Sequence, residues 1–93
     1  MSDQKAVHVI VRGDVQGVGF RHFTRMNATQ FGVAGWVRNN YDGTVEIWAE
    51  GPESKLNLFI QAVRRGPSYS RVDKLDITWK TSKGEARSFN IRY

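Results

Sequence analysis

The 93-residue chain has no cysteine and only two histidines. Without cysteine there is no disulfide, no thiolate nucleophile and no cysteine-based zinc site. His8 and His22 lack metal-ligand spacing to each other, so we expect no metal and no cofactor. The chain also lacks the run of about 18 apolar residues that a membrane-spanning helix needs. Its polar start shows no signal peptide, and we therefore expect a cytoplasmic protein that does not bind membranes.

The composition is that of an ordinary globular protein with an excess of positive charge. Hydrophobic residues make up 40% of the chain, charged residues make up 25%, and the formal net charge is +5. We expect residues 1–93 to form a single monomeric domain with one modest core. The basic surface favours an anionic partner, either nucleic acid or a small anionic substrate. The basic residues are dispersed, however, which is typical of a solvated surface.

The periodicity of hydrophobic residues predicts alternating strands and helices. Alternating valines predict a strand over Ala6–Arg12, and a stripe with helical spacing predicts a helix over Phe20–Gln30. The other predicted elements are strands at 35–39, 44–50, 72–80 and 89–93 and a helix between Gly51-Pro52 and Gly66-Pro67. This order is the ferredoxin-like β-α-β-β-α-β plan with a short terminal strand. It is an α+β fold with two helices packed on one face of an antiparallel sheet.

A glycine-rich stretch, Gly13-Asp14-Val15-Gln16-Gly17-Val18-Gly19-Phe20-Arg21, joins the first predicted strand to the first predicted helix. Its glycines permit positive φ angles, and its successive N–H groups can form an anion-binding nest beside the helix N-terminus. Arg21 lies in the first helical turn, where its guanidinium can bind a phosphate-like anion through two hydrogen bonds. The stretch therefore indicates either a site for a small phosphorylated group or a glycine-rich turn with a solvated arginine.

Asn39 lies where the second predicted strand approaches its turn, near the end of the first strand in this topology. Its amide can donate and accept hydrogen bonds at once, so it can hold a water beside a bound phosphoryl group. Alternatively, it begins the turn that ends at Gly43, as asparagine commonly does. We interpret His22 as a solvated neighbour of Arg21 and His8 as a structural residue.

Four motifs together resemble the acylphosphatase family: Gly13-x-Val15-Gln16-Gly17-Val18-Gly19-Phe20-Arg21, Gly35-Trp36-Val37-Arg38-Asn39, Gly43-Thr44-Val45 and Gly51-Pro52. The resemblance covers nearly the whole chain. It implies a ferredoxin-like enzyme that hydrolyses the carboxyl–phosphate bond of acyl phosphates without a metal. By this resemblance Asn39 orients the attacking water, and Arg21 binds the phosphate together with backbone N–H groups of Gln16, Gly17, Val18, Gly19 and Phe20. At Gly19 some members of the family carry another residue, which affects the flexibility of the loop more than the chemistry.

The chemistry of an acyl phosphate suits a site that has no evident acid–base pair. A carboxylate, whose conjugate acid has a pKa of about 4, can leave without a general acid. Phosphoryl transfer needs mainly positioning and charge stabilisation, which a fixed arginine and oriented N–H donors supply. We expect a small-molecule acyl phosphate as the substrate and inorganic phosphate or sulfate as competing anions.

Two other classes of protein share features with this chain. An RNA-recognition module has the same order of elements, but its third strand carries several aromatic residues. Here that region reads Asp42-Gly43-Thr44-Val45-Glu46-Ile47-Trp48, with two acidic residues and one aromatic residue, so we expect no specific nucleic-acid partner. A non-catalytic module that binds a small anion would keep the glycine-rich loop and would not need Asn39.

Overall fold

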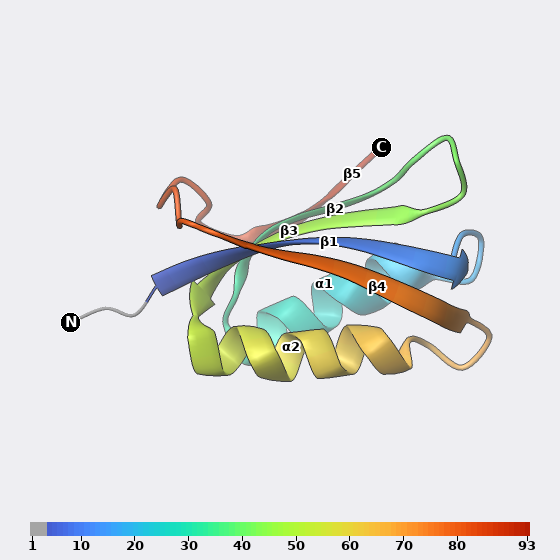
Figure 1. The fold of residues 1–93 in the computed structure, drawn as a ribbon, viewed down its shortest axis with the longest axis horizontal. Helices are drawn as coiled ribbons and strands as arrows, with labels where there is room; N and C mark the ends of the chain where they lie inside the picture. The colour runs from blue at the N-terminus through green and yellow to red at the C-terminus, as the bar shows by residue number, and fades with distance from the viewer. Residues whose placement is uncertain (1–3) are drawn as a thin grey trace.

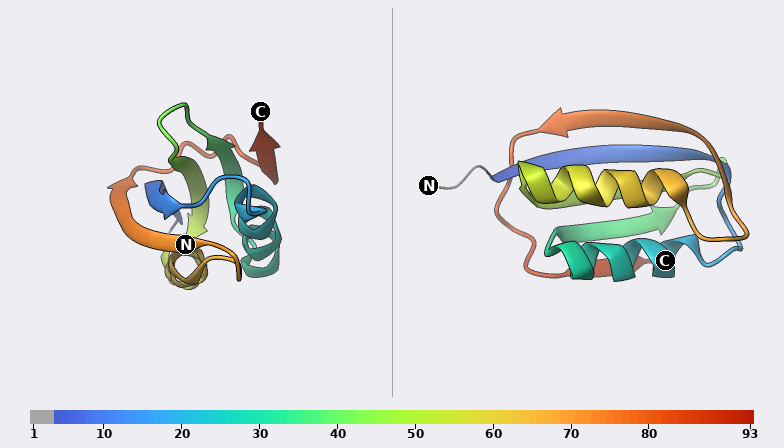
Figure 2. Two further views of the ribbon diagram at one scale, coloured as in Figure 1. Left: turned by 90° about the vertical axis from the view of Figure 1, so that its right-hand side faces the viewer. Right: turned by 90° about the horizontal axis from the view of Figure 1, so that it is seen from below.

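The computed structural model describes residues 4–93. Its elements, in order, are β1 (Gln4–Asp14), α1 (Phe20–Phe31), β2 (Ala34–Asn39), β3 (Val45–Pro52), α2 (Glu53–Arg65), β4 (Arg71–Lys80) and β5 (Phe89–Arg92) (Figure 1). The strands form one sheet in the order β4-β1-β3-β2-β5. Both helices lie on the same face of this sheet, as the view from below shows (Figure 2). The ferredoxin-like fold predicted from the sequence is confirmed.

The direction of the last strand differs from the predicted antiparallel sheet. The first four strands pair antiparallel, whereas β5 runs parallel to β2, with Arg92 opposite Arg38. The sheet is therefore mixed. The physical reason is the position of β4 at the opposite edge: residues 81–88 carry the chain across the sheet and turn it back. β5 consequently runs opposite to β4, which is also the direction of β2.

A buried carboxylate holds this crossing connection against the sheet. Glu50 on β3 is 6% exposed, and its Oε1 accepts hydrogen bonds from the Ser82 hydroxyl at 2.6 Å and the Gly84 N–H at 2.9 Å. Its Oε2 accepts from Trp48 Nε1 at 2.8 Å. Burial acts to raise the pKa of Glu50, but the hydrogen bonds, led by that from Ser82, outweigh it and the pKa lies below its usual value. The connection is thus fixed through an ionised side chain.

The hydrophobic core lies between the sheet and the two helices. Val7, Val9 and Val11 alternate along β1 with their side chains toward the helices, because successive strand residues face opposite sides. The hydrophobic stripe of α2 is buried against the sheet and consists of Leu56, Phe59, Ile60 and Val63. Trp79, near the end of the edge strand β4, is 43% exposed. Neither described helix is long and apolar enough to cross a membrane.

Candidate active site

The loop between β1 and α1 is built around two glycines in the left-handed conformation. Gly17 has a φ of 75° and Gly19, the N-cap of α1, has a φ of 77°. A residue with a Cβ is strained in this conformation, so both positions favour glycine. Val15 and Phe20 are buried and attach the two ends of the loop to the core. The loop is thus held at its ends while its glycines lie at the surface.

The N-terminus of α1 has unsatisfied hydrogen-bond donors and a positive potential. Gly19 provides no side-chain cap, and the first turn of the helix contains no acidic residue. The first N–H groups of a helix have no intrahelical partner, and the helix dipole adds positive charge at this end. An anion placed against the loop would accept hydrogen bonds from these N–H groups and would be attracted by the positive end of the dipole. The same first turn carries Arg21.

Asn40 makes the hydrogen bonds of the β2–β3 turn, which leaves Asn39 outside the turn. The Asn40 N–H donates to the Thr44 carbonyl at 2.9 Å, and Asn40 Nδ2 donates to Thr44 Oγ1 at 3.0 Å. Asp42 Oδ1 accepts from Thr44 Oγ1 at 2.7 Å and from the Thr44 N–H at 3.1 Å, and these bonds lower the pKa of Asp42. Among residues 4–93 no hydrogen bond is made to the Asn39 side chain. The alternative in which Asn39 starts the turn is therefore wrong.

A small cavity of about 160 Å³ brings Arg21 and Asn39 together. Its walls come from the loop, the start of α1, the end of β2 and the last residues of the chain: Val15, Gly17, Gly19, Phe20, Arg21, His22, Asn39, Ile91 and Tyr93. Figure 1 shows the β1–α1 loop and the β2–β3 turn at the same end of the molecule. Residues that are distant in sequence thus converge on a space large enough to hold a phosphoryl group.

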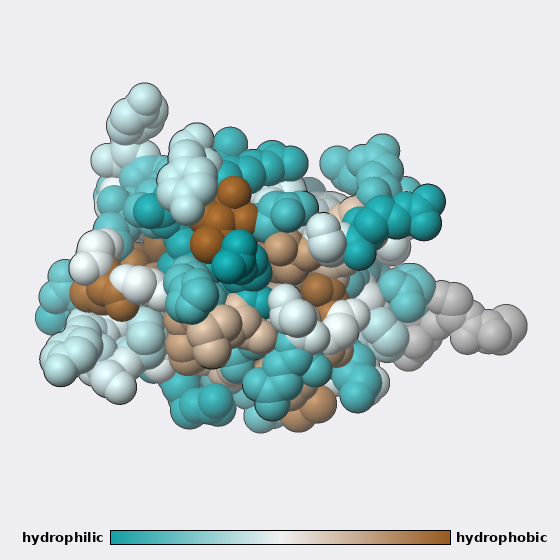
Figure 3. Space-filling model, turned by 180° about the vertical axis from the view of Figure 1, so that it is seen from behind, coloured by the Kyte–Doolittle hydropathy of each residue, from teal (hydrophilic) through white to brown (hydrophobic). Residues whose placement is uncertain are grey.

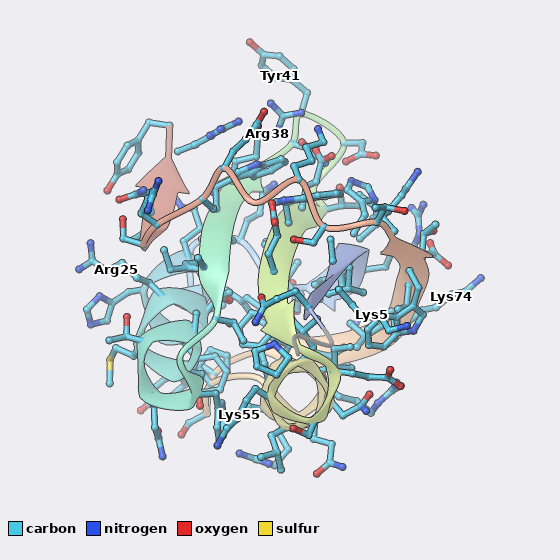
Figure 4. All side chains as sticks on the ribbon, turned by 90° about the vertical axis from the view of Figure 1, so that its left-hand side faces the viewer. Lys5, Arg25, Arg38, Tyr41, Lys55 and Lys74 are labelled. Carbon is cyan, nitrogen blue, oxygen red and sulfur yellow. The ribbon has the colours of Figure 1, made fainter. Side chains whose placement is uncertain are left out.

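A wider groove of about 600 Å³ adjoins this cavity and shares Asn39 and Tyr93 with it. Its other walls are Gln16, Arg38, Asn40 and Tyr41. Tyr41 projects outward from the β2–β3 turn, and Arg38 lies at the base of that turn (Figure 4). Of the loop residues predicted to bind phosphate, Gly17, Gly19 and Phe20 line the small cavity, Gln16 lines the groove, and Val18 packs against the core.

Arg21 contacts an aromatic ring at the cavity instead of a carboxylate. Its guanidinium lies over the Tyr93 ring, 4.7 Å from the ring centroid, and it forms no ion pair within residues 4–93. His22 is exposed at the rim of the same cavity. The sequence pattern contains no signal that places Tyr93 here, because the parallel pairing of β5 with β2 is what brings it beside Asn39.

His8 lies on the helix-free face of the sheet, away from the cavity. Its Nε2 is 2.6 Å from Glu46 Oε2, while Arg38 Nε donates to Glu46 Oε1 at 3.0 Å. Burial acts to raise the pKa of Glu46, but the hydrogen bonds from His8 and Arg38 outweigh it and the pKa lies below its usual value. The structural interpretation of His8 agrees with this contact. Among the described residues, no three or more histidine, aspartate or glutamate side chains are grouped to hold a metal ion.

A third cavity, also of about 600 Å³, lies on the helix-free face of the sheet, between Trp36, Trp48 and the connection to β5. Its tryptophans are already covered by cations: Lys83 Nζ lies 5.0 Å from Trp48, and the Arg92 guanidinium lies 4.5 Å from Trp36. Seen from behind, the hydrophobic residues of the surface form small areas separated by polar ones (Figure 3).

Fold and cavity together have the features of an α+β domain that binds phosphoryl groups, with an anion-binding loop, an arginine and an amide at one end of the sheet. Comparison with known proteins identifies the family. The sequence pattern of the family described as Acylphosphatase matches residues 7–91. An acylphosphatase of Salinibacter ruber is 44% identical over 89 residues, which cover 96% of this chain and 94% of the relative.

The similarity extends to a solved structure. The acylphosphatase of Bacillus subtilis is 47% identical over 85 residues, 91% of this chain and 93% of the relative. The crystal structure of acylphosphatase from Bacillus subtilis aligns with a TM-score of 0.93 at 45% identity, over 96% of this chain and 99% of that one. The chain therefore belongs to the acylphosphatase family, and it is an enzyme of that family.

Proposed function

We propose that this single-domain enzyme hydrolyses the carboxyl–phosphate bond of small acyl phosphates to a carboxylate and inorganic phosphate. The observation that carries the proposal is the small cavity that Arg21, Asn39 and the loop glycines line together. Its volume of about 160 Å³ is large enough for a phosphoryl group, and it adjoins a larger groove. Family membership supports the reaction class, and the geometry supports the roles of the residues.

In this proposal the phosphoryl group lies in the loop. Backbone N–H groups over Gln16–Phe20 donate to its oxygens, as a nest beside a helix N-terminus does for many phosphates. Arg21 adds a charge-assisted pair of hydrogen bonds. Its guanidinium has no carboxylate partner within residues 4–93, so binding the substrate breaks no ion pair of Arg21. These donors stabilise the transition state more than the ground state, because charge redistributes over the equatorial oxygens as the reaction proceeds.

Asn39 holds the attacking water. Its amide is not used by the neighbouring turn, and it borders both the small cavity and the open groove, along which water can reach it. The water oxygen forms a bond to phosphorus while the bond from phosphorus to the acyl oxygen breaks, and the carboxylate leaves with that electron pair. In-line displacement requires the acyl group to lie on the side of phosphorus away from the water.

The water proton passes to a phosphoryl oxygen of the substrate, which makes a protein general base unnecessary. A carboxylate leaving group needs no proton, since its conjugate acid has a pKa of about 4. The reaction therefore proceeds without a bound metal ion. We further propose that the enzyme acts as a cytoplasmic monomer and that inorganic phosphate or sulfate competes for the loop.

The test is release of phosphate from benzoyl phosphate and acetyl phosphate, with and without a chelator. We expect equal rates under both conditions and little action on a phosphate monoester such as p-nitrophenyl phosphate, whose leaving group is poorer. Activity that is lost on chelation and restored by a divalent ion would contradict the mechanism. Binding of inorganic phosphate without hydrolysis of either acyl phosphate would instead support a non-catalytic anion-binding module.

A further inference from the structure

Tyr93 occupies a position at the candidate site that none of the proposed catalytic roles uses. β5 pairs in parallel with β2, and Arg92 lies opposite Arg38. The residue that follows this pair along the chain is Asn39 at the end of β2 and Tyr93 directly after β5. These two are the residues common to the small cavity and the adjoining groove. Tyr93 thus forms part of the boundary between the two spaces.

The Tyr93 ring also supports the arginine of the site. The guanidinium carbon of Arg21 lies over the ring at 4.7 Å from its centroid, although the tyrosine itself is 99% exposed. A guanidinium that stacks on a ring uses its face, so the N–H donors in its plane remain free for an anion. A free arginine side chain has many rotamers, and ordering it opposes binding. A ring that already restricts those rotamers reduces that cost.

We propose that Tyr93 is a positioning residue that holds the Arg21 guanidinium at the cavity in an orientation able to bind a phosphoryl group. The proposal deepens the proposed function and rests on Arg21 as the phosphate-binding residue. The cost of ordering Arg21 falls equally on the ground state and the transition state. Loss of the ring should therefore raise KM and the inhibition constant of phosphate together and leave kcat nearly unchanged.

The effect should be small because the contact is exposed. Cation–π contacts at exposed sites correspond to about a two- to five-fold change in an equilibrium constant. Tyr93→Leu should weaken the binding of inorganic phosphate by that factor, and Tyr93→Phe, which keeps the ring and removes the hydroxyl, should bind as the wild type does. Tyr69→Leu is the matched control, since Tyr69 is 89% exposed and lines neither the small cavity nor the groove.

The measurements are a titration of the full chain with inorganic phosphate, followed by calorimetry or chemical shifts, and steady-state kinetics with benzoyl phosphate. Tyr93→Gln serves as a second ring-free variant, and thermal unfolding of each variant checks the fold. The proposal is overturned if Leu and Gln bind phosphate as the wild type does, if Phe binds as weakly as Leu, or if kcat falls while phosphate affinity is retained. If the wild type hydrolyses no acyl phosphate, the proposed function fails, yet the phosphate titration still tests the role of Tyr93.

Discussion

The Gln16 side-chain amide donates to the main-chain carbonyl of Asn40 at 2.8 Å, linking two segments that are 24 residues apart in the sequence. The same Nε2 donates to the Thr44 carbonyl at 2.8 Å. Gln16 therefore ties the glycine-rich loop to the turn that follows Asn39. One side chain thereby holds the glycine-rich loop next to the segment that carries Asn39.

Replacing Gln16 should disturb the position of the glycine-rich loop relative to Asn39 more than it disturbs the fold. We expect Gln16→Leu, which is similar in size but has no donor, to lower kcat/KM about ten-fold or more, because small displacements of reacting groups have large effects on rate. The free energy of unfolding should fall by about 1 kcal/mol, the low end for lost hydrogen bonds. Both carbonyls keep another donor, since Asn40 accepts from the Gly43 N–H and Thr44 accepts from the Asn40 N–H.

Chemical denaturation and steady-state kinetics with benzoyl phosphate measure the two effects. Gln61→Leu on the exposed side of α2 is the control, because it makes the same chemical change away from the loop. A Gln16→Leu variant with normal kcat/KM would show that the backbone alone holds the loop in place.

The local elements were predictable from the sequence because their signals are local. Alternating valines predicted β1, and hydrophobic residues at helical spacing predicted α1. Gly17 and Gly19 were recognisable for the same reason, since a left-handed conformation is a property of the single residue. The positions of Arg21 and Asn39 at one end of the sheet followed from the order of the elements.

The features of the site that were not predicted from the sequence depend on pairings between distant segments of the chain. The sequence did not show that Gln16 acts through its side chain, because its partners belong to a turn on another pair of strands. Tyr93 was predicted only as part of a final strand, and its place beside Asn39 depends on the parallel register of β5.

Glu50 should make the stability of the protein depend on pH. Its pKa is lowered in the folded state, so its contribution is fully present above the unfolded value of about 4.3 and is lost as the pH falls through the lower folded value. We expect Glu50→Gln to be less stable than the wild type by about 1–3 kcal/mol near neutral pH, because three partly buried donors lose a charged acceptor. In acid the difference between the two proteins should shrink.

Chemical denaturation at a series of pH values measures this difference. Glu85→Gln in the same connection is the control, since Glu85 is exposed and its replacement changes the net charge equally. Glu46 and Asp42 also have lowered pKa values, but they are common to both proteins and cancel in the comparison. A difference that stays constant into acid would mean that the Glu50 charge is not what stabilises the connection.

Arg21 and Asn39 should fail in different ways when they are replaced. Arg21 is proposed to contact the phosphoryl group in both the ground state and the transition state, so Arg21→Ala should weaken phosphate binding and also reduce kcat/KM by about 10³-fold or more. Asn39 is proposed to hold only the water, so Asn39→Ala should reduce kcat by about 10²–10³-fold while the inhibition constant of phosphate stays near the wild-type value. Neither change should prevent folding, because both side chains line a cavity at the surface.

Steady-state kinetics with benzoyl phosphate and competition by inorganic phosphate separate these outcomes, with circular dichroism as the check on folding. Arg21→Lys keeps the charge and should still be poor, because an ammonium group does not reproduce the planar pair of donors. Asn40→Ala is the matched control for Asn39: it removes a neighbouring amide that serves the turn, so it should lower stability more than it lowers kcat. If a folded Asn39→Ala keeps normal kcat, then Asn39 does not position the water, and the attacking water must be held by the loop or by the substrate itself.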